Sequence, residues 1–592
     1  MAGLCATLNN RSIHNMTNNL LTTPNLEVKD TYSDENIAIS QVSLKKNLFK
    51  CFQSADIVIF IEGYCYNLDE LGKLFNIIET TFAEQLFWAY KNNQLKKYCN
   101  KVNGFYHATI YDKTKKKILL ISDRLGTRFV FYYYKDNYFA FSGEVKGLLA
   151  LDEVDKTIDT ISAECFVNGG PNFYLLDDNT HFNYIKLLKP STILEYNIEE
   201  STLSQEYYWK WSEIKPQEIS YEDAINILHE LIEDAVLKRM KHINLNDILL
   251  PLSGGLDSRL IFAILNNHHK VPKFIFTNGS PKCTDVVFAK KLCKKYGYSH
   301  YINSPQSYSN YIENGSHYAY RPDGMVFFIE FGTYLPFLDY HYSITGYVGD
   351  MIFGASFKDD AALLDKKMTQ DLAEKLYGKF YELSDYKNDF YEINKIEPSL
   401  FMNRVRRYTT QMINVGLNHS EPILPYIDNK IIDFIYSIPD EYRANNNLYS
   451  DMLLKYYNEY YKNIPWTANN LPIQGKLYKN NKFNINMLRE KVINSTLLSK
   501  KWKRSILKRI NIYNLIYKPT FHVFQEELAK DENINLIKEK YINERSLCMK
   551  YLSKETIDVI NNSIKYKNTW QLALILTYEF YLRDLEKRGY LK

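Results

Sequence analysis

Short hydrophobic runs separated by polar turns predict β-strands over much of the first 150 residues. The charged stretch 113–116 divides two of these runs, and Lys-Asp-Asn at 135–137 divides the last, so two hairpins are expected. Helical periodicity predicts helices at about 68–79 and 82–97. The predicted strands lie within residues 55–64, 104–112, 117–124 and 128–143. Strands accompanied by a pair of helices indicate a layered α+β domain.

The pattern changes after residue 160. Gly and Pro interrupt residues 160–212, which we interpret as a connecting region. Beyond it, strand and helix patterns alternate, which predicts a parallel sheet with right-handed crossovers. The predicted helices are 221–240, 258–267 and 285–297, and the predicted strands are 247–252 and 273–278. Past about residue 360 the pattern is mainly helical.

Length and composition restrict the class of protein. A chain of 592 residues exceeds one ordinary core, and we expect domains at 1–205 and 206–592. A formal net charge of +4 gives no case for a nucleic-acid partner. The eight scattered cysteines include no CxxC pair, which favours a reducing compartment over a zinc or disulfide framework. With no transmembrane run and no signal-peptide pattern, a cytoplasmic location is expected.

The stretch ILLPLSGGLDSRL at 248–260 carries the clearest chemistry. An apolar strand runs into Ser-Gly-Gly and then into a helix, whose first N–H groups and dipole attract anions. Glycines let the backbone approach phosphates, two serines supply hydroxyls, and Asp257 suits a magnesium ion. The Gly-Lys-Ser/Thr ending of a Walker loop is absent. The alternative, a tight turn with a capping serine, accounts for a lone Gly-Gly but not for the full string.

This string resembles the pyrophosphate loop of the ATP pyrophosphatases, which cleave ATP to AMP and pyrophosphate while activating a carboxylate or carbonyl. Three further stretches are similar to the asparagine synthetases: 123–151, TGYVGDMIFG at 345–354, and LPYIDNKIIDFIYSIPDEYR at 424–443. The resemblance implies an N-terminal nucleophile hydrolase-like α+β sandwich, then an α/β ATP-pyrophosphatase synthetase domain that uses ATP and Mg²⁺. The ATP- and pyrophosphate-binding residues it implies are Leu252, Ser253, Gly254, Gly255, Leu256, Asp257, Ser258, Thr277 and Gly346.

The N-terminal half departs from the family pattern. Active glutaminases of this family begin Met-Cys-Gly, whereas Ala2 stands at the position of the nucleophile. Cys5 comes three residues too late, and we interpret it as a buried strand cysteine. The glutamine-holding Asn-Gly-Glu is replaced by Glu62-Gly63-Tyr64, and a later Asp by Phe82. We therefore expect an inactive glutaminase domain, retained as a scaffold.

In the synthetase half, Asp257 and Asp350 match the magnesium-binding pair of the family. Tyr347 stands where amidating members carry Glu, and a Tyr there resembles the β-lactam synthetases, in which a Tyr–Glu pair takes the proton from a substrate amine. The predicted partner is Glu382, with Glu374 and Glu392 as alternatives.

The family also carries a late Lys that stabilises adenylation. Lys476 and Lys455 are the candidates, although neither aligns cleanly. Residues 476–518 form a basic insertion with about a dozen Lys and Arg, which suits an acidic peptide, a partner protein or a membrane surface, or is a solvated helix face.

Without ammonia from glutamine, the nucleophile is expected to be an amine carried by a substrate, either separate from the carboxylate or on the same molecule. Two branches of the family have this property, the lasso peptide cyclases, which close a macrolactam ring, and the β-lactam synthetases. The length and basic C-terminal region favour the peptide cyclase, with a precursor or core peptide as substrate. A maturation protease or a peptide-recognition protein would be its partner. The alternatives are β-lactam-type or other small-molecule amide synthesis, ammonia-dependent asparagine synthesis, and an inactive scaffold.

Overall fold

The computed structural model describes residues 3–8, 12–169, 175–328, 340–354, 369, 371, 400–467, 472–478, 502 and 522–591. None of the helices in these ranges combines the length and apolar composition that crossing a bilayer requires.

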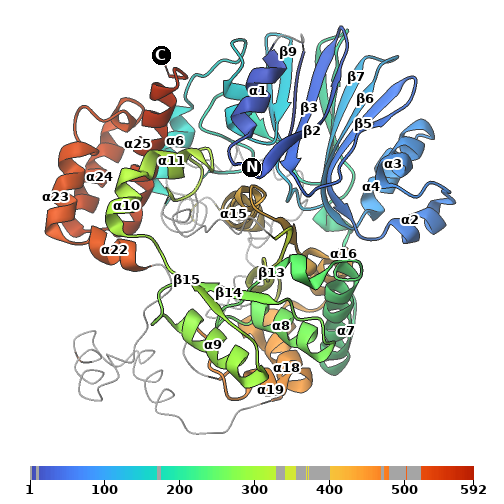
Figure 1. The fold of residues 1–592 in the computed structure, drawn as a ribbon, viewed down its shortest axis with the longest axis vertical. Helices are drawn as coiled ribbons and strands as arrows, with labels where there is room; N and C mark the ends of the chain where they lie inside the picture. Colours follow the sequence, from blue (N-terminus) through green and yellow to red (C-terminus); the bar gives the residue numbers. More distant parts are fainter. Residues whose placement is uncertain are drawn as a thin grey trace.

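Two six-stranded sheets face each other in the N-terminal domain (Figure 1). The first sheet runs, in spatial order, β10 (Ile185–Leu187), β8 (Phe131–Lys135), β9 (Tyr138–Ser142), β1 (Gly3–Leu8), β3 (Ile37–Leu44) and β2 (Leu26–Ser33). The second runs β12 (Thr202–Tyr207), β11 (Thr192–Asn197), β7 (Lys117–Ser122), β6 (Gly104–Asp112), β5 (Ile57–Cys65) and β4 (Phe52–Gln53). All pairs are antiparallel.

Alternation along these strands builds the sandwich. Successive side chains point to opposite faces, so every second residue of a central strand enters the space between the sheets. Leu4, Ile39, Phe60 and Leu120 belong to one buried cluster in that space. Cys5, the residue after Leu4, belongs to a different cluster that covers the other face of the first sheet. The predicted α+β sandwich is therefore confirmed.

Helices cover both outer faces of the sandwich. They are α1 (Ile13–Leu20), α5 (Val145–Leu149) and α6 (Thr160–Asn168) beside the first sheet, and α2 (Leu68–Phe75), α3 (Phe82–Lys91) and α4 (Leu95–Lys101) beside the second. The predicted helix at 82–97 is in fact two, because Asn93 adopts a left-handed conformation (φ 54°) between α3 and α4.

The interpretation of 160–212 as a connecting region was wrong. These residues form α6 and three strands, β10, β11 and β12, which complete both sheets. β12 is an edge strand of the second sheet and keeps most of its side chains exposed, whereas β11 lies between β12 and β7. The polar face of an edge strand weakens the hydrophobic alternation by which strands are recognised.

The C-terminal domain is built around a parallel sheet of five strands. Their order is β15 (Tyr301–Asn303), β14 (Phe274–Asn278), β13 (Ile248–Pro251), β16 (Tyr342–Ile344) and β17 (Glu421–Ile423). Every pair is parallel, as the alternation of strands and helices predicts. β13 is the central strand, so the loop that follows it lies at the middle of the carboxyl edge of the sheet.

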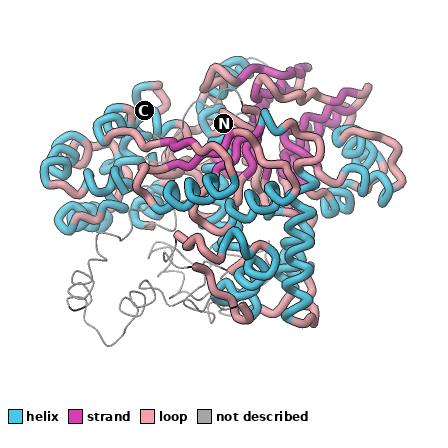
Figure 2. Tube along the Cα trace, turned by 60° about the horizontal axis from the view of Figure 1, so that its bottom comes forward, coloured by secondary structure: helices cyan, strands magenta, loops and turns pink. Residues whose placement is uncertain are grey.

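Helices make up most of the remainder of the described chain (Figure 2). Those near the sheet are α7 (Tyr221–Arg239), α8 (Asp257–Asn267), α9 (Thr284–Tyr296), α12 (Gly349–Ile352), α15 (Thr410–Gly416), α16 (Asn429–Ser437), α17 (Asp440–Arg443), α18 (Asn447–Tyr456) and α19 (Asn458–Tyr461). A second group comprises α10 (Tyr308–Glu313), α11 (Gly315–Tyr320), α22 (His522–Leu528), α23 (Asp531–Lys540), α24 (Lys554–Tyr566) and α25 (Thr569–Lys587). Within it, α25 packs against α11 and against α6 of the N-terminal domain (Figure 1).

Candidate active site

The loop between β13 and α8 is closed by its own serine hydroxyls. Ser253 Oγ lies 3.0 Å from Ser258 Oγ, and the Ser253 amide donates to Ser258 Oγ at 3.0 Å. The Gly255 amide donates to Ser253 Oγ at 3.1 Å. The first turn of α8 begins at Asp257, at the positive end of the helix dipole. The sequence thus folds into the strand–loop–helix arrangement that it predicted, while the binding of an anion there stays a prediction.

Three side chains without a predicted role hold this loop from behind. The buried guanidinium of Arg259 donates to the carbonyls of Gly254 (2.7 Å), Ile464 and Pro465. Tyr461 Oη donates to the Leu256 carbonyl and Tyr426 Oη to the Asp257 carbonyl. The carbonyls on the rear of the loop are therefore paired within the protein.

A second loop, 345–350, follows β16 and lies directly on the first. A Cβ atom at Gly346 would come within 2.7 Å of Asp257 Cβ and 2.8 Å of the Ser258 nitrogen. At Gly349 it would come within 2.5 Å of the Asp257 carboxyl carbon. Both glycines are therefore needed for the contact between the loops. Val348, between them, has φ 58°, a strained conformation for a β-branched residue that costs about 1–3 kcal/mol.

The two loops bring Asp257 and Asp350 together. Burial, and after it the charge of Asp350, raises the pKa of Asp257 to about 8. Two carboxylates in one partly closed site favour a bound cation, which would offset their repulsion. Over the ranges that the structure describes, no group of three or more His, Cys, Asp or Glu side chains could hold a metal ion. The pair would suit a magnesium ion, which prefers oxygen ligands such as carboxylates, phosphate groups and water.

Tyr347 is buried, and its hydroxyl contacts Thr410 Oγ1 of α15. Thr410 donates its own proton to the Val405 carbonyl at 3.1 Å, so the Tyr347 hydroxyl is the donor in their contact. Burial raises the pKa of Tyr347 well above its usual value, with the hydrogen bond to Thr410 acting in the opposite direction. The phenol therefore keeps its proton and offers lone pairs to a donor.

Both loops open onto one cavity of about 410 Å³. Of the predicted ATP-binding residues, those that line it are Leu252, Ser253, Gly255, Asp257, Ser258, Thr277 and Gly346, and Tyr347 and Asp350 line it as well. Thr277 also joins two strands, since its hydroxyl donates to the Leu252 carbonyl at 2.5 Å. Lining residues that the sequence did not point to include Asp285, which accepts from the Gly254 amide at 3.0 Å, and Thr409, Met412 and Ile413. Asp285 is the first residue of the predicted helix 285–297, and an acidic residue at the start of a helix beside this loop could have marked it as a candidate.

Other predicted residues lie elsewhere. Lys476 is not among the residues that line the cavity, and its ammonium lies 5.1 Å from the centre of the Tyr221 ring. Lys455 pairs with Glu222 at 2.8 Å, also away from the cavity. Glu382, Glu374 and Glu392 lie outside the described residues, as do Ala2 and most of the basic segment 476–518.

In the N-terminal domain, Cys5 and Glu62 are sealed inside the protein. Cys5 is fully buried and burial raises the pKa of its thiol to about 12, which confirms a buried strand cysteine. Glu62 is 1% exposed and lies 3.9 Å from Nε of Arg128. Burial raises the pKa of Glu62 to about 7, although Arg128 lowers it in part.

Two aromatic replacements have structural contacts. The Tyr64 ring packs against Tyr342 of β16, with centroids 6.3 Å apart, so it joins the two domains. Phe82 packs edge-on against Tyr106, with centroids 5.0 Å apart. Arg128 extends the connection, because its Nη1 donates to Glu421 of β17 at 3.0 Å.

Comparison with known proteins agrees with this architecture. Residues 39–209 match the glutamine amidotransferase domain family and residues 228–409 match the asparagine synthase family. Two relatives from Methanocaldococcus jannaschii are provisionally named asparagine synthetases (glutamine-hydrolyzing). The first is 28% identical over 51% of this chain, and the second is 23% identical over 58% of it. The matches span 59% and 58% of the length of those relatives. Asparagine synthetase (glutamine-hydrolyzing) 3 of Bacillus subtilis is 21% identical over 72% of this chain and 76% of its own length. The chain belongs to the asparagine synthetase family.

Proposed function

We propose that this protein is an ATP-dependent ligase that activates a substrate carboxylate as an acyl-adenylate and joins it to an amine. The packing of Gly349 against Asp257 carries the proposal, because it brings both acidic residues and the Ser253–Ser258 loop into one cavity. A phosphate-binding loop beside two carboxylates suits the departure of pyrophosphate from ATP.

The reaction has two steps. A carboxylate oxygen of the substrate attacks the α-phosphorus of ATP, and the bond to pyrophosphate breaks. The amine then attacks the carbonyl carbon, AMP leaves, and the amine nitrogen loses a proton. The loop serines and the start of α8 hold the leaving pyrophosphate, and Arg259 keeps the loop rigid.

Magnesium, when bound by Asp257 and Asp350, would neutralise charge on the phosphate oxygens. Asp257 reaches this position from the helix start and Asp350 from α12.

We propose further that the N-terminal domain releases no ammonia from glutamine. Ala2 offers no thiol, and the sealed carboxylate of Glu62 replaces a residue that would hold glutamine. Tyr64, at the end of the same replaced motif, packs against the synthetase sheet instead. The amine would then belong to the substrate, and the product would be a lactam.

For the substrate, we propose a peptide whose own amine closes a macrolactam ring, as in lasso peptide cyclases. Tyr347 would orient the amine through a phenol lone pair, since its proton is held by Thr410. Glu382 is its predicted basic partner. A processed core peptide would be the substrate, aided by a protease or peptide-recognition protein in the cytoplasm.

A β-lactam closure is the second candidate, because Tyr347 occupies the position of the proton-accepting Tyr of that branch. Ammonia-dependent asparagine formation is a further alternative, and the pyrophosphate-release assay described below distinguishes it from ring closure.

The test is pyrophosphate release by the full-length protein with ATP and Mg²⁺. A core peptide encoded beside this gene should trigger release and lose the mass of one water. Asp257→Asn should abolish both. Release with aspartate and ammonium, yielding asparagine, would replace the cyclase proposal, and release that persists unchanged in Asp257→Asn would refute the site. Incubation with glutamine alone should yield no glutamate.

A further inference from the structure

One helical segment, residues 401–416, forms a wall of the cavity and is held by the N-terminal domain. It consists of a π-helical stretch, Phe401–Thr409, followed directly by α15. Thr409, Met412 and Ile413 line the cavity and are partly exposed. Arg406, Thr410 and Asn414, which follow one another at intervals of four, are buried. The segment therefore has a cavity face and a packed face.

Contacts on the packed face lead into the N-terminal domain. Arg406 Nε donates to the Gly126 carbonyl at 3.1 Å. Asn414 accepts from the Phe129 amide at 3.0 Å and donates to the Thr127 carbonyl at 2.7 Å. The Asn414 side chain thus both donates to and accepts from the backbone segment that precedes β8, and this pair of hydrogen bonds fixes the rotation of the helix about its axis. The orientation of Met412 and Ile413 thus depends on the N-terminal domain.

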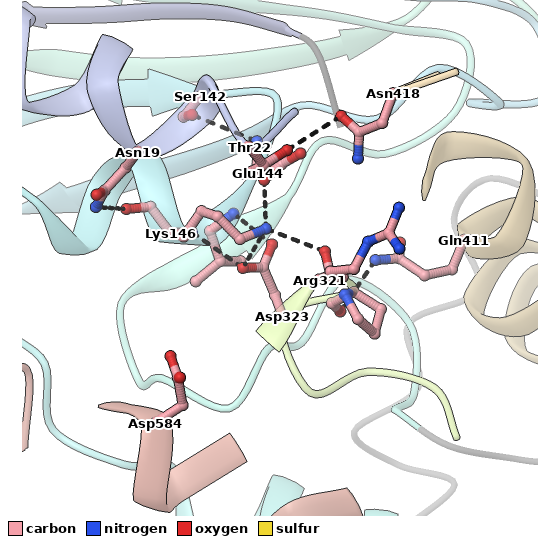
Figure 3. Close-up of polar contacts among 12 residues, drawn as sticks. Asn19, Thr22, Ser142, Glu144, Lys146, Arg321, Asp323, Gln411, Asn418 and Asp584 are labelled. Carbon is pink, nitrogen blue, oxygen red and sulfur yellow. Dashed lines mark hydrogen bonds and ion pairs between the residues drawn. The ribbon is translucent and has the colours of Figure 1, made fainter. Parts of the chain in front are cut away.

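A buried charge cluster supplies a second connection (Figure 3). The fully buried ammonium of Lys146 contacts Glu144, lies 3.1 Å from Asp323, and donates to the Arg321 carbonyl. Asp323 also accepts from the Lys146 amide. The next carbonyl in this loop, that of Pro322, accepts from Gln411 Nε2 at 3.2 Å. Lys146 and Glu144 of the N-terminal domain thus hold the loop 321–323, and this loop in turn contacts α15 through Gln411.

The cavity has two flanks on either side of the phosphate loop. β14 on one side brings Phe276, Thr277 and Asn278, and β16 on the other leads to Tyr347 and the wall. In the proposed reaction the nucleotide and the carboxylate substrate would meet at this loop, which would leave one flank of the cavity for each. On the second flank Met412, Ile413 and Val348 present apolar surface, near the carboxylates of Asp257 and Asp350.

We propose that Met412 and Ile413 select the carboxylate substrate, and that it carries an apolar group beside a single carboxylate. This inference rests on the proposed ligase function. Burying that group against the wall is favourable, whereas a second carboxylate placed against Met412 and Ile413 would lose its hydration without gaining a hydrogen-bonding partner. Asn414 acts as a positioning residue for the wall.

The experiment is carboxylate-dependent exchange of pyrophosphate into ATP by the full-length protein. N-acetylleucine and N-acetylphenylalanine serve as apolar probes, and aspartate and N-acetylglutamate as dicarboxylates. We expect the apolar probes to give at least about tenfold higher kcat/KM. Met412→Lys should reverse this preference by about tenfold and leave the KM for ATP unchanged, and Met412→Leu should retain it.

Met549→Lys is the matched control, because Met549 is also partly buried but lies away from the cavity. It should leave the preference intact. Asn414→Ala should raise the carboxylate KM and spare the KM for ATP, whereas an equal rise in both would overturn the positioning role.

Preference of the unaltered protein for aspartate would overturn the inference and leave the ligase proposal standing. A preference unaffected by Met412→Lys would do the same. Exchange with none of the four probes, nor with a core peptide, would refute carboxylate activation itself and this inference with it.

Discussion

Gly349 lies against Asp257 so closely that any side chain at position 349 would displace the carboxylate. The distance from an added Cβ to the Asp257 carboxyl carbon is 2.5 Å, shorter than real Cβ contacts. These residues are far apart in the sequence, and each belongs to a loop at the carboxyl end of a parallel strand. Their contact sets the distance between the two acidic loops.

Gly349→Ala should therefore reduce pyrophosphate release by about a hundredfold, because a shift of about 1 Å in a catalytic group has that effect. Initial rates at saturating ATP provide the measurement. Gly297→Ala is a matched control, since Gly297 has φ +78° but nothing within 4 Å of an added Cβ. It should cost about 1 kcal/mol of stability and leave the rate unchanged. Equal rates in the two variants would contradict the proposed loop contact.

Asp257→Asn should abolish pyrophosphate release without destabilising the protein free of ligand. Because the pKa of Asp257 is about 8, the native side chain is mostly protonated at pH 7, and the amide resembles that form. The thermal midpoint should remain within a few degrees, while the increase produced by ATP with Mg²⁺ should disappear. A variant that ATP and Mg²⁺ stabilise as before would show that Asp257 holds no metal.

Tyr347→Phe should separate the two half-reactions. Loss of the hydroxyl removes the group that we expect to orient the amine, so amide formation should slow about 10–100-fold. Adenylation, followed by pyrophosphate exchange, should change little. Thr410→Val tests the same contact from the other side and should slow only the second step. Slower exchange in Tyr347→Phe, with the second step intact, would assign Tyr347 to ATP binding instead.

Glu62→Gln should change how stability depends on pH. The native pKa of Glu62, about 7, is above its ordinary value near 4.5, so the folded protein binds a proton that the unfolded chain releases. Stability from this group is complete below pH 4.5 and falls as pH rises to 7, by about 3 kcal/mol.

Gln, which cannot ionise, should remove that loss, so the variant should gain stability relative to the parent between pH 5 and 8. Urea denaturation at several pH values gives the difference. The exposed Glu218→Gln is the control and should give a difference that does not vary with pH. A difference for Glu62→Gln that is likewise constant would show that Glu62 is ionised throughout.

The sequence by itself determined those features that depend on residues close together along the chain, namely individual strands and helix ends and the Ser-Gly-Gly motif. Strand β6 has the predicted bounds, 104–112, and Gly297 ends α9 in a left-handed conformation as a C-terminal Gly should. The Ser253–Ser258 loop could likewise be recognised because its strand–loop–helix geometry is local. Strands β10, β11 and β12 were missed for different reasons. β10 has only three residues, β11 begins with three buried residues in succession, and the edge strand β12 keeps most of its side chains exposed, so none shows a clear alternation.

Contacts between distant segments were decided only by the tertiary structure. Asn414 binds the backbone of Thr127 and Phe129, and Arg128 binds Glu421, across nearly 300 residues of sequence. Periodicity gives the faces of a helix or strand but does not name the partner that covers them. That choice depends on how whole layers pack, which is why the sequence indicated ATP chemistry while the wall formed by Met412 and Ile413 became visible only in the fold.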